Sequence, residues 1–299
     1  MFQPTEEMAP FLPASVVVPT IGRTELLRRC LESLLACRPL PAEILVVDQS
    51  RGSAVTDLAG ALDEGKRVRV LKSKGRGIAE GTNLGVRAAL HEAVLVTHDD
   101  CTVATDWIGV AVELLAGHHG AIFTGRVLAP ADAAYVPSTI DASEPVDYTG
   151  RITSGVLYPA NMAFERDAMV EFGGFDERPG LRLAGEDNDL CFRWLCDGRP
   201  LRYEPSLLVW HHDWRSPDQL RRTHVTYARG QGAFYAKHLL ERRREVLPLL
   251  RWDLGEGLKA QLRGFRRATP RWQDPYREMT VSLVLGIASE LWRGRDRRR

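Results

Sequence analysis

The sequence predicts an α/β fold with a Rossmann-like, doubly wound and mostly parallel sheet, followed by a helical C-terminal extension. In residues 14–100, short β-branched apolar runs alternate with segments of helical periodicity, which is typical of parallel βαβ units. Further along the charge changes: residues 215–299 hold 20 Lys+Arg and 9 Asp+Glu, a net charge of +11, which leaves −10 for residues 1–214. We therefore expect an acidic α/β domain over residues 14–214 and a basic helical extension after it.

The elements of the first half follow from apolar runs and their boundaries. We expect an irregular leader over residues 1–13, which contain three prolines. A buried strand over Ala14–Thr20 comes next, and then a helix over Arg23–Cys37 with Thr24 as a candidate N-cap. Further strands are expected at Ala42–Ser50, Arg67–Ser73 and Ala93–Asp100, and helices at residues 53–63 and Gly77–Leu90.

The second half is less regular and contains no internal repeat. A loop region is expected over residues 131–155, because prolines interrupt it. After Trp214 the chain turns basic and helical. The elements expected before that point are strands at Ala121–Pro130 and Leu201–His212 and a helix at Glu186–Gly198, which a glycine ends.

Polar residues stand where several of the expected strands end. Thr20, Asp48 and the pair Asp99–Asp100 each follow an apolar run. In open parallel sheets, ligands bind in the crevice beyond the carboxyl ends of the strands. These side chains are therefore expected to face one shared crevice.

The stretch VTHDDCTVATDWI carries the strongest chemical signal. Asp99 and Asp100 are adjacent, and two carboxylates side by side need a counter-charge. Mg²⁺ prefers carboxylates together with phosphate oxygens, and Mn²⁺ also accepts an imidazole such as that of His98. The pattern favours a metal–diphosphate site. The competing interpretation is that one carboxylate caps the helix that starts near Asp106.

Three other positions each have a functional and a structural interpretation. Asp48 is suited to accept hydrogen bonds from a nucleobase, or to form an Asx turn with the residues after it. The acidic pair Glu186–Asp187 lies in a first helical turn, where negative charge also favours the helix dipole; the functional alternative is a general base. His211 ends a strand, and its side chain has either a structural role or a place among the metal ligands.

The five cysteines include no Cys-x-x-Cys pair, and with no secretory signal pattern at the start they predict reduced thiols and a cytoplasmic location.

The apolar stretch Met279–Trp292 is too short to span a bilayer comfortably. Beside the arginines of 293–299 it predicts peripheral membrane contact at the inner face; the alternative is packing on the catalytic domain or a homodimer seam. The glycines of KGRGIAEG lack dinucleotide or P-loop spacing. We expect no nucleic-acid partner.

Taken in order, these segments resemble a family 2 glycosyltransferase of the GT-A fold. The likeness rests on VVVPTIGR, ILVVDQS, VTHDDCTVATDWI, YPANMAFERDAM and the block from FGGFDERPG to LLVWHH. It covers roughly Ala14 to Trp214, and YARGQGAFYAKHL beyond it is a weaker match. Within this domain the resemblance implies a nucleotide-binding half over about 14–105 and an acceptor half over about 106–214.

The resemblance also implies roles by matching position. The nucleotide-sugar pocket would contain Pro19, Thr20, Arg23, Asp48, Gly77, Asn83 and Asp99. A divalent cation, Mn²⁺ or Mg²⁺, would be held on the diphosphate by Asp100, with His98 and His211 as further ligands. Asp187 would be the catalytic base beside Glu186, and Asn161, Met162 and Trp210 would lie on the acceptor side. The implied reaction inverts the anomeric centre as a sugar moves from a nucleoside-diphosphate donor to the hydroxyl of a glycan, lipid-linked or small-molecule acceptor.

Two departures from the family pattern keep other functions open. Many relatives have Asp where His98 stands, and Arg where Thr82 stands, a loss for which Arg76 is a candidate replacement. One alternative is a non-catalytic carbohydrate-binding or scaffold protein on a decayed transferase fold, against which the intact Glu186–Asp187 pair counts. Another is a nucleotidyltransferase, although PTIGRTELL replaces the glycine-rich basic loop expected after its first strand.

Overall fold

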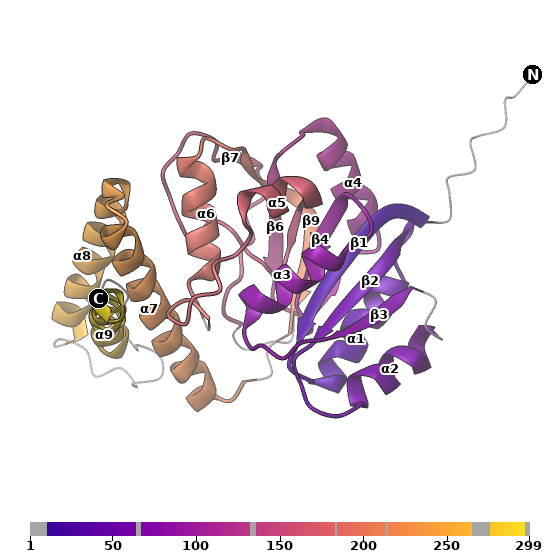
Figure 1. Cartoon of the computed structure of the whole chain (residues 1–299), viewed down its shortest axis with the longest axis horizontal. Helices are drawn as coiled ribbons and strands as arrows, with labels where there is room; N and C mark the ends of the chain where they lie inside the picture. Colours follow the sequence, from indigo (N-terminus) through magenta and orange to yellow (C-terminus); the bar gives the residue numbers. More distant parts are fainter. Residues whose placement is uncertain are drawn as a thin grey trace, which may run out of the picture.

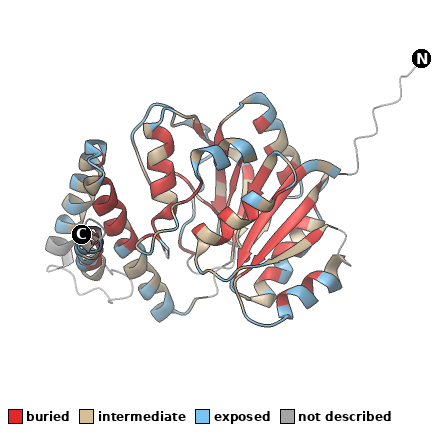
Figure 2. Ribbon diagram, viewed as in Figure 1, coloured by how far each residue is buried: buried red, intermediate tan, exposed pale blue. Residues whose placement is uncertain are grey.

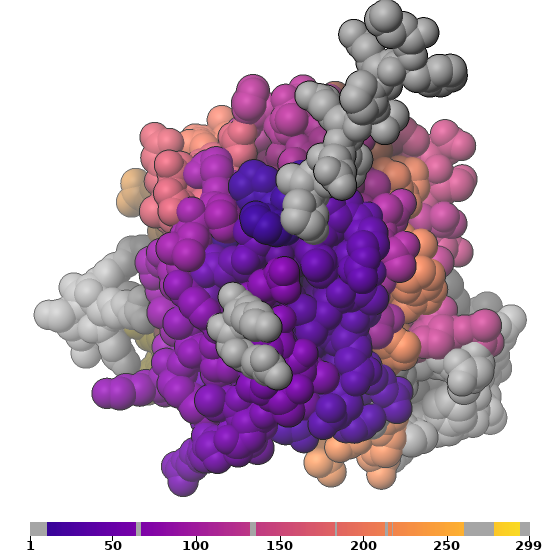
Figure 3. Space-filling model, turned by 90° about the vertical axis from the view of Figure 1, so that its right-hand side faces the viewer, coloured from indigo at the N-terminus to yellow at the C-terminus, as the bar shows by residue number. Residues whose placement is uncertain are grey.

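The computed structural model describes residues 11–63, 67–131, 136–182, 184–212, 215–264 and 276–296. An α/β body with a central sheet occupies one end of the molecule, and the helices α7, α8 and α9 lie together at the other end, beside α6 (Figure 1). Turned by 90°, the face opposite these helices is formed mostly by the first half of the chain (Figure 3).

In the part of the chain that the structure describes, nine strands form one mixed sheet in the order β3-β2-β1-β4-β8-β6-β9-β5, with β7 paired to β9. The strands β1 to β4 are mutually parallel where they pair, and β8 runs antiparallel to both of its neighbours. The strands are β1 (Phe11–Thr20), β2 (Leu40–Asp48), β3 (Val68–Lys72), β4 (Ala93–Val96), β5 (Cys101–Val103), β6 (Ile122–Leu128), β7 (Val146–Asp147), β8 (Met162–Glu165) and β9 (Leu201–His211).

Helices cover both faces of the sheet, as the βαβ pattern predicts (Figure 1). In β1, Val16 and Val18 pack with α1 and α4 on one face, whereas Val17 packs with α3 on the other. The central strands are therefore buried throughout (Figure 2). The helices are α1 (Thr24–Leu35), α2 (Ala54–Asp63), α3 (Ile78–Ala88), α4 (Trp107–Gly117), α5 (Arg166–Phe172), α6 (Glu186–Cys196), α7 (Pro217–Leu240), the short η1 (Arg244–Val246), α8 (Leu247–Gly264) and α9 (Tyr276–Asp296).

The structure corrects three expected boundaries. β1 begins at Phe11, within the expected leader, and its pairing with β2 shifts register around Pro13, which has no N–H to donate. Residues 1–10 of that leader lie outside the described residues. The N-cap of α1 is Arg23, and Thr24 is already helical. β4 ends at Val96, because the chain turns through Asp99–Asp100 and starts β5 against β9.

Buried charges attach the C-terminal helices to the body. Lys237 of α7 forms ion pairs with Asp189 of α6 and with Asp176, and His238 contacts the same Asp189 oxygen at 2.9 Å. Asp189, Lys237 and His238 are almost completely buried, so α7 is a fixed part of the body. Within the described part of the chain, no helix combines the length and the apolar character that crossing a membrane requires.

Candidate active site

A cavity of about 840 Å³ opens at the carboxyl ends of β1 and β4, where the sequence predicts the ligand crevice. Its size is in the range of small-molecule sites. Both halves of the body and helix α7 contribute to it. The predicted residues that line it are Pro19, Thr20, Arg23, Gly77, His98, Asp99, Asp100, Glu186, Asp187 and His211.

Arg23 contacts both of the adjacent carboxylates, Asp99 and Asp100. Its Nε donates to Asp99 Oδ2 at 3.2 Å and a second nitrogen bonds Asp99 Oδ1, while Nη1 lies 3.0 Å from Asp100 Oδ2. The Thr20 hydroxyl also donates to Asp99, at 2.6 Å. Burial raises the pKa of Asp99 more than these partners lower it. Arg23 therefore supplies part of the counter-charge that the two carboxylates need.

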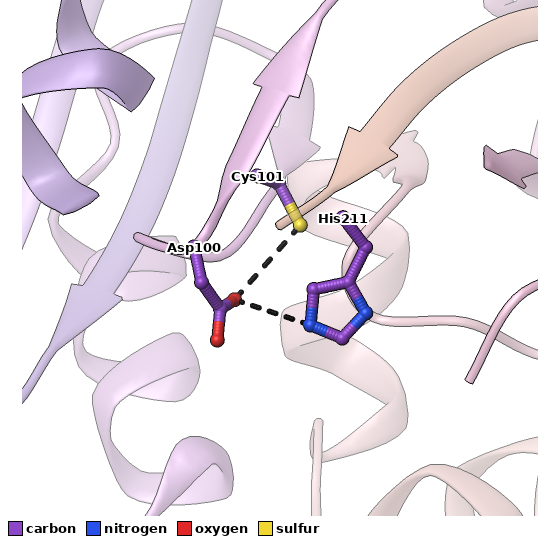
Figure 4. Close-up of side chains that lie close together, drawn as sticks. All are labelled: Asp100, Cys101 and His211. Carbon is purple, nitrogen blue, oxygen red and sulfur yellow. Dashed lines mark hydrogen bonds and ion pairs between the residues drawn. The ribbon is translucent and has the colours of Figure 1, made fainter. Parts of the chain in front are cut away.

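Asp100 and His211 face each other because β5 pairs with β9, with Cys101 opposite His211 (Figure 4). Asp100 Oδ1 lies 3.6 Å from His211 Nε2. His211 Nδ1 is 3.0 Å from the carbonyl oxygen of Pro137, to which it can donate. Nε2 is therefore the ring nitrogen that faces Asp100, the arrangement found in metal-binding histidines.

These groups fit a divalent cation. Asp100, Cys101 and His211 each offer a ligand atom within 4.8 Å of the others, the one such group among the residues described. Burial raises the pKa of the Cys101 thiol far above its usual value, so the sulfur stays protonated and is a poor ligand. Burial also raises the pKa of Asp100, but His211 and Arg23 outweigh it and keep the carboxylate ionised. An oxygen and an imidazole nitrogen suit Mn²⁺.

His98 lines the same cavity but lies outside this group of ligand atoms. Its side chain is partly buried, and burial lowers its pKa to about 4, so the imidazole is neutral. The buried Nε2 has no hydrogen-bond partner among the described residues. His98 therefore presents an unused polar atom at the cavity, and its metal role stays a prediction.

Glu186 and Asp187 begin α6, after Gly185 takes a left-handed conformation at φ 87°. Both line the cavity. Asp187 Oδ1 accepts a hydrogen bond from the backbone N–H of Asn188 at 2.7 Å. Even so, burial raises the pKa of Asp187 to about 6, and burial together with Asp187 raises that of Glu186 well above its usual value. Two neighbouring acids with raised pKa values at a cavity are typical of acid–base chemistry.

Gly77 is placed at the cavity by the loop between β3 and α3. It has φ 113°, and a Cβ there would collide with the backbone oxygen of Arg182. The Gln49 side chain bonds both backbone groups of Gly77, at 2.8 Å and 3.2 Å. A contact between the two halves of the body thus forms part of the wall.

Two residues predicted for the nucleotide pocket do not line the cavity. Asp48 is fully buried; Lys72 pairs with it and the N–H of Ser50 donates to it at 2.8 Å. The Asx turn is therefore formed, and the residues 49–51 after it reach the cavity. Asn83 instead joins α3 to the loop after α5, where its amide bonds both backbone groups of Phe175.

The three predicted acceptor residues also lie outside the cavity lining. The Asn161 amide accepts from Trp107 Nε1 at 2.9 Å and donates to two backbone carbonyls. Met162 is completely buried in β8, and Trp210 pairs across strands with Leu128 and Thr102. The neighbouring residues 157–160 line the cavity in their place.

Several lining residues were not predicted. Arg182 lies in the block that contains Glu186–Asp187, and Arg215 and Tyr227 come from the basic extension. Arg76, the candidate replacement for the missing family arginine, and Arg51 also line the cavity. Together with Arg23 they surround it with guanidinium groups, which bind phosphate oxygens well. The weak likeness in YARGQGAFYAKHL, which starts at Tyr227, was the available signal for the extension.

The sequence model of the family described as "Glycosyl transferase family 2" matches residues 15–169, more than half of the 299-residue chain. The chain belongs to glycosyl transferase family 2. The predicted family is thereby confirmed, and with it the class of enzyme, a glycosyltransferase.

Two curated members of similar sequence are known. The Pre-mycofactocin glycosyltransferase of Mycobacterium tuberculosis is 28% identical over 211 residues, 66% of this chain and 42% of that protein. The Glucosyl-dolichyl phosphate glucuronosyltransferase of Haloferax volcanii is 26% identical over 183 residues, 56% of this chain and 57% of that protein. The chain thus spans about half the length of the curated relatives it matches.

Among solved structures, the mannosyltransferase PcManGT from Pyrobaculum calidifontis, in complex with GDP-Man and Mn²⁺, superposes with a TM-score of 0.62. It is 18% identical, and the match covers 94% of this chain and 87% of that one. The likeness confirms the predicted GT-A fold.

Proposed function

We propose that this family 2 glycosyltransferase moves a sugar from a nucleoside-diphosphate donor to an acceptor hydroxyl and inverts the anomeric centre. The observation that carries the proposal is that Asp187, at the start of α6, and the Asp100–His211 pair, where β5 meets β9, line one cavity. A base on one side and a diphosphate-binding group on the other is the arrangement that in-line displacement at a sugar carbon requires.

Asp187 is the proposed general base. It takes the proton of the acceptor hydroxyl as the oxygen attacks the anomeric carbon, and the bond from that carbon to the diphosphate oxygen breaks. A pKa of about 6 makes Asp187 a stronger base than an ordinary carboxylate, yet leaves it ionised at neutral pH. Burial and the neighbouring Asp187 raise the pKa of Glu186 well above its usual value, which favours its neutral form and disfavours a second negative charge.

Asp100 and His211 are the proposed holders of a divalent cation, Mn²⁺ or Mg²⁺. When bound, the cation neutralises charge on the departing diphosphate. Arg23 engages Oδ2 of Asp100 and leaves Oδ1 directed at His211. The arginines at 51, 76 and 182 are placed to bind the phosphate oxygens directly.

The acceptor is proposed to enter beside Tyr158 and Tyr227, which line the cavity together with Asp187. The two curated relatives differ in the substrates that their names specify, glucosyl-dolichyl phosphate in one and pre-mycofactocin in the other. We therefore propose a hydroxyl-bearing acceptor without choosing between these classes. A cytoplasmic site of action agrees with five cysteines that are all free thiols.

Incubation with UDP-, GDP-, dTDP- and CDP-sugars, with and without Mn²⁺, tests the proposed reaction. The expected result is metal-dependent release of one free nucleoside diphosphate, accelerated by acceptor. Exchange of pyrophosphate into the donor would instead indicate a nucleotidyltransferase. Donor binding without any release, across all four nucleotides and a panel of acceptors, would favour a non-catalytic binding protein.

A further inference from the structure

Helix α9 has an apolar outer face. Val281, Val284, Leu285, Ala288 and Trp292 follow one another at helical spacing, and we call these five residues the α9 stripe. Four of them are 50–67% exposed, and Ala288 is also exposed. Residues at spacings of three and four lie on one side of a helix, so the stripe is continuous.

The opposite face of α9 is used for packing. Leu283 and Glu290 are buried, and Gly286 lies so close to α7 that a Cβ would collide with the Arg229 backbone. The usual arrangement of a surface helix is reversed, because a carboxylate points inward and a row of apolar side chains points outward. No described residue of the chain covers the stripe enough to bury it.

The neighbouring helix α8 adds large apolar side chains to the same end of the molecule (Figure 1). Trp252 is 68% exposed and Leu258 is 61% exposed. A cation stands next to each, Arg251 and Lys259, and both are exposed. Tryptophan, leucine and valine beside lysine and arginine are typical of helices that lie in the interface of a bilayer.

Charge distinguishes between two binding partners for this apolar face, a second copy of the chain and a lipid bilayer. Residues 215–299 carry a net charge of +11, so two copies that met through this face would bring together two strongly positive segments. An anionic bilayer supplies the opposite charge, and each Lys or Arg near it contributes about 1 kcal/mol.

We propose that the α9 stripe is a docking surface for an anionic lipid bilayer. Binding is peripheral and reversible, because shallow burial of the side chains and attraction of the cations act together. The α9 stripe is held in place relative to the active-site cavity, because α9 packs on α7 and α7 contributes Tyr227 to the cavity lining. The inference concerns binding alone and stands or falls separately from the proposed reaction.

Sedimentation with phosphatidylcholine vesicles, with and without phosphatidylglycerol, tests this surface in the full chain. The double variant carries Leu285→Gln and Trp292→Gln, both at exposed positions of the stripe. The matched control is a separate single variant, Leu90→Gln, at an apolar residue on the body that is 65% exposed. We expect the wild type and the control to pellet with anionic vesicles at low salt and much less at high salt. The double variant should bind about tenfold or more weakly, with an unchanged melting temperature.

Three results would overturn the proposal. The wild type could fail to pellet with anionic vesicles at low salt, or the double variant could bind as well as the control does. The third is a wild-type dimer in sedimentation equilibrium that the double variant converts to a monomer while vesicles have no effect. That last result would assign the stripe to an interface between copies of this chain.

Discussion

Asp100 has its two carboxylate oxygens in different surroundings, and this division underlies a first prediction. Oδ2 is bonded by Arg23, whereas Oδ1 is directed at His211. Asp100→Ala removes the only anionic ligand of the described metal group, so metal-dependent donor binding should be lost. His98→Ala should weaken it much less, because a neutral imidazole adds no charge. Thermal-shift titration of nucleoside diphosphates with Mn²⁺ measures both; a ligand at ~100 times its dissociation constant adds about 2.7 kcal/mol of stability.

The same titration can show the assignment of the main ligand to be wrong. That would be the case if His98→Ala abolished the Mn²⁺-dependent shift as fully as Asp100→Ala. His98→Asp restores the commoner family residue and should keep the shift while moving the preference toward Mg²⁺.

The raised pKa of Asp187 leads to a pH prediction. A general base is active when unprotonated, so kcat/KM should be level above pH 6 to 7 and fall about tenfold per pH unit below about pH 6. The direction follows from burial, which favours the neutral acid. A pH–rate profile measured at saturating Mn²⁺ tests this. Activity that stayed level down to pH 5 would show that the base has an ordinary carboxylate pKa or is another group.

At the scale of elements, α7 supports the turn that presents Asp187. Gly230 lies against Ala184 and Gly185, and a Cβ there would collide with the Ala184 backbone. Gly230→Ala should therefore displace the start of α6 and lower kcat by about 100-fold, the cost of a misplacement near 1 Å. Gly255→Ala in α8, where a Cβ meets open space, is the matched control and should raise stability by up to about 1 kcal/mol with unchanged kcat.

Steady-state kinetics and thermal unfolding of both variants distinguish a loss of positioning at Asp187 from a general loss of stability. If Gly230→Ala retained full kcat while folded, α7 would not position the base. If Gly255→Ala lost as much kcat, the effect would not be specific to the contact with α6.

The elements also show which side chains a sequence can place. The carboxyl end of β1 at Thr20 was predicted correctly, because an apolar run locates the end of a strand directly, whereas Asp99–Asp100 lie in the turn after β4, which ends at Val96. The hydrogen bonds of Asn161 could not be predicted, because a carboxamide beside a cavity has the same sequence pattern whether it faces the ligand or satisfies buried backbone groups. Only the pairing of β6, β8 and β9 fixes which of these occurs.

For the whole molecule, the alternation of strands and helices was enough to predict the α/β class, but not how its second half closes. The pairing of β5 with β9 joins residues about 110 apart, and it places His211 opposite Asp100. Local periodicity contains no information on such long-range pairs. The entry of Tyr227 into the cavity was missed for a similar reason, since a basic helix has the same composition whether it is solvated or packed.

The acidic body and basic extension remain one functional unit in this account. α7 contributes Tyr227 to the cavity, α6 carries Asp187, and the buried ion pair of Lys237 with Asp189 holds the two helices together. The central claim is that Asp187 acts in the transfer step and not in donor binding, which makes it separable from every residue on the diphosphate side.

Turnover and donor affinity of Asp187→Asn, measured side by side with wild type, test that claim most directly. Asp197→Asn at the exposed end of the same helix is the matched control. We predict that Asp187→Asn lowers kcat by about 10²–10⁴-fold and leaves the Kd for the metal-bound donor within about threefold, while Asp197→Asn changes neither. Equal losses of donor affinity and rate, or full activity of Asp187→Asn, would contradict the account.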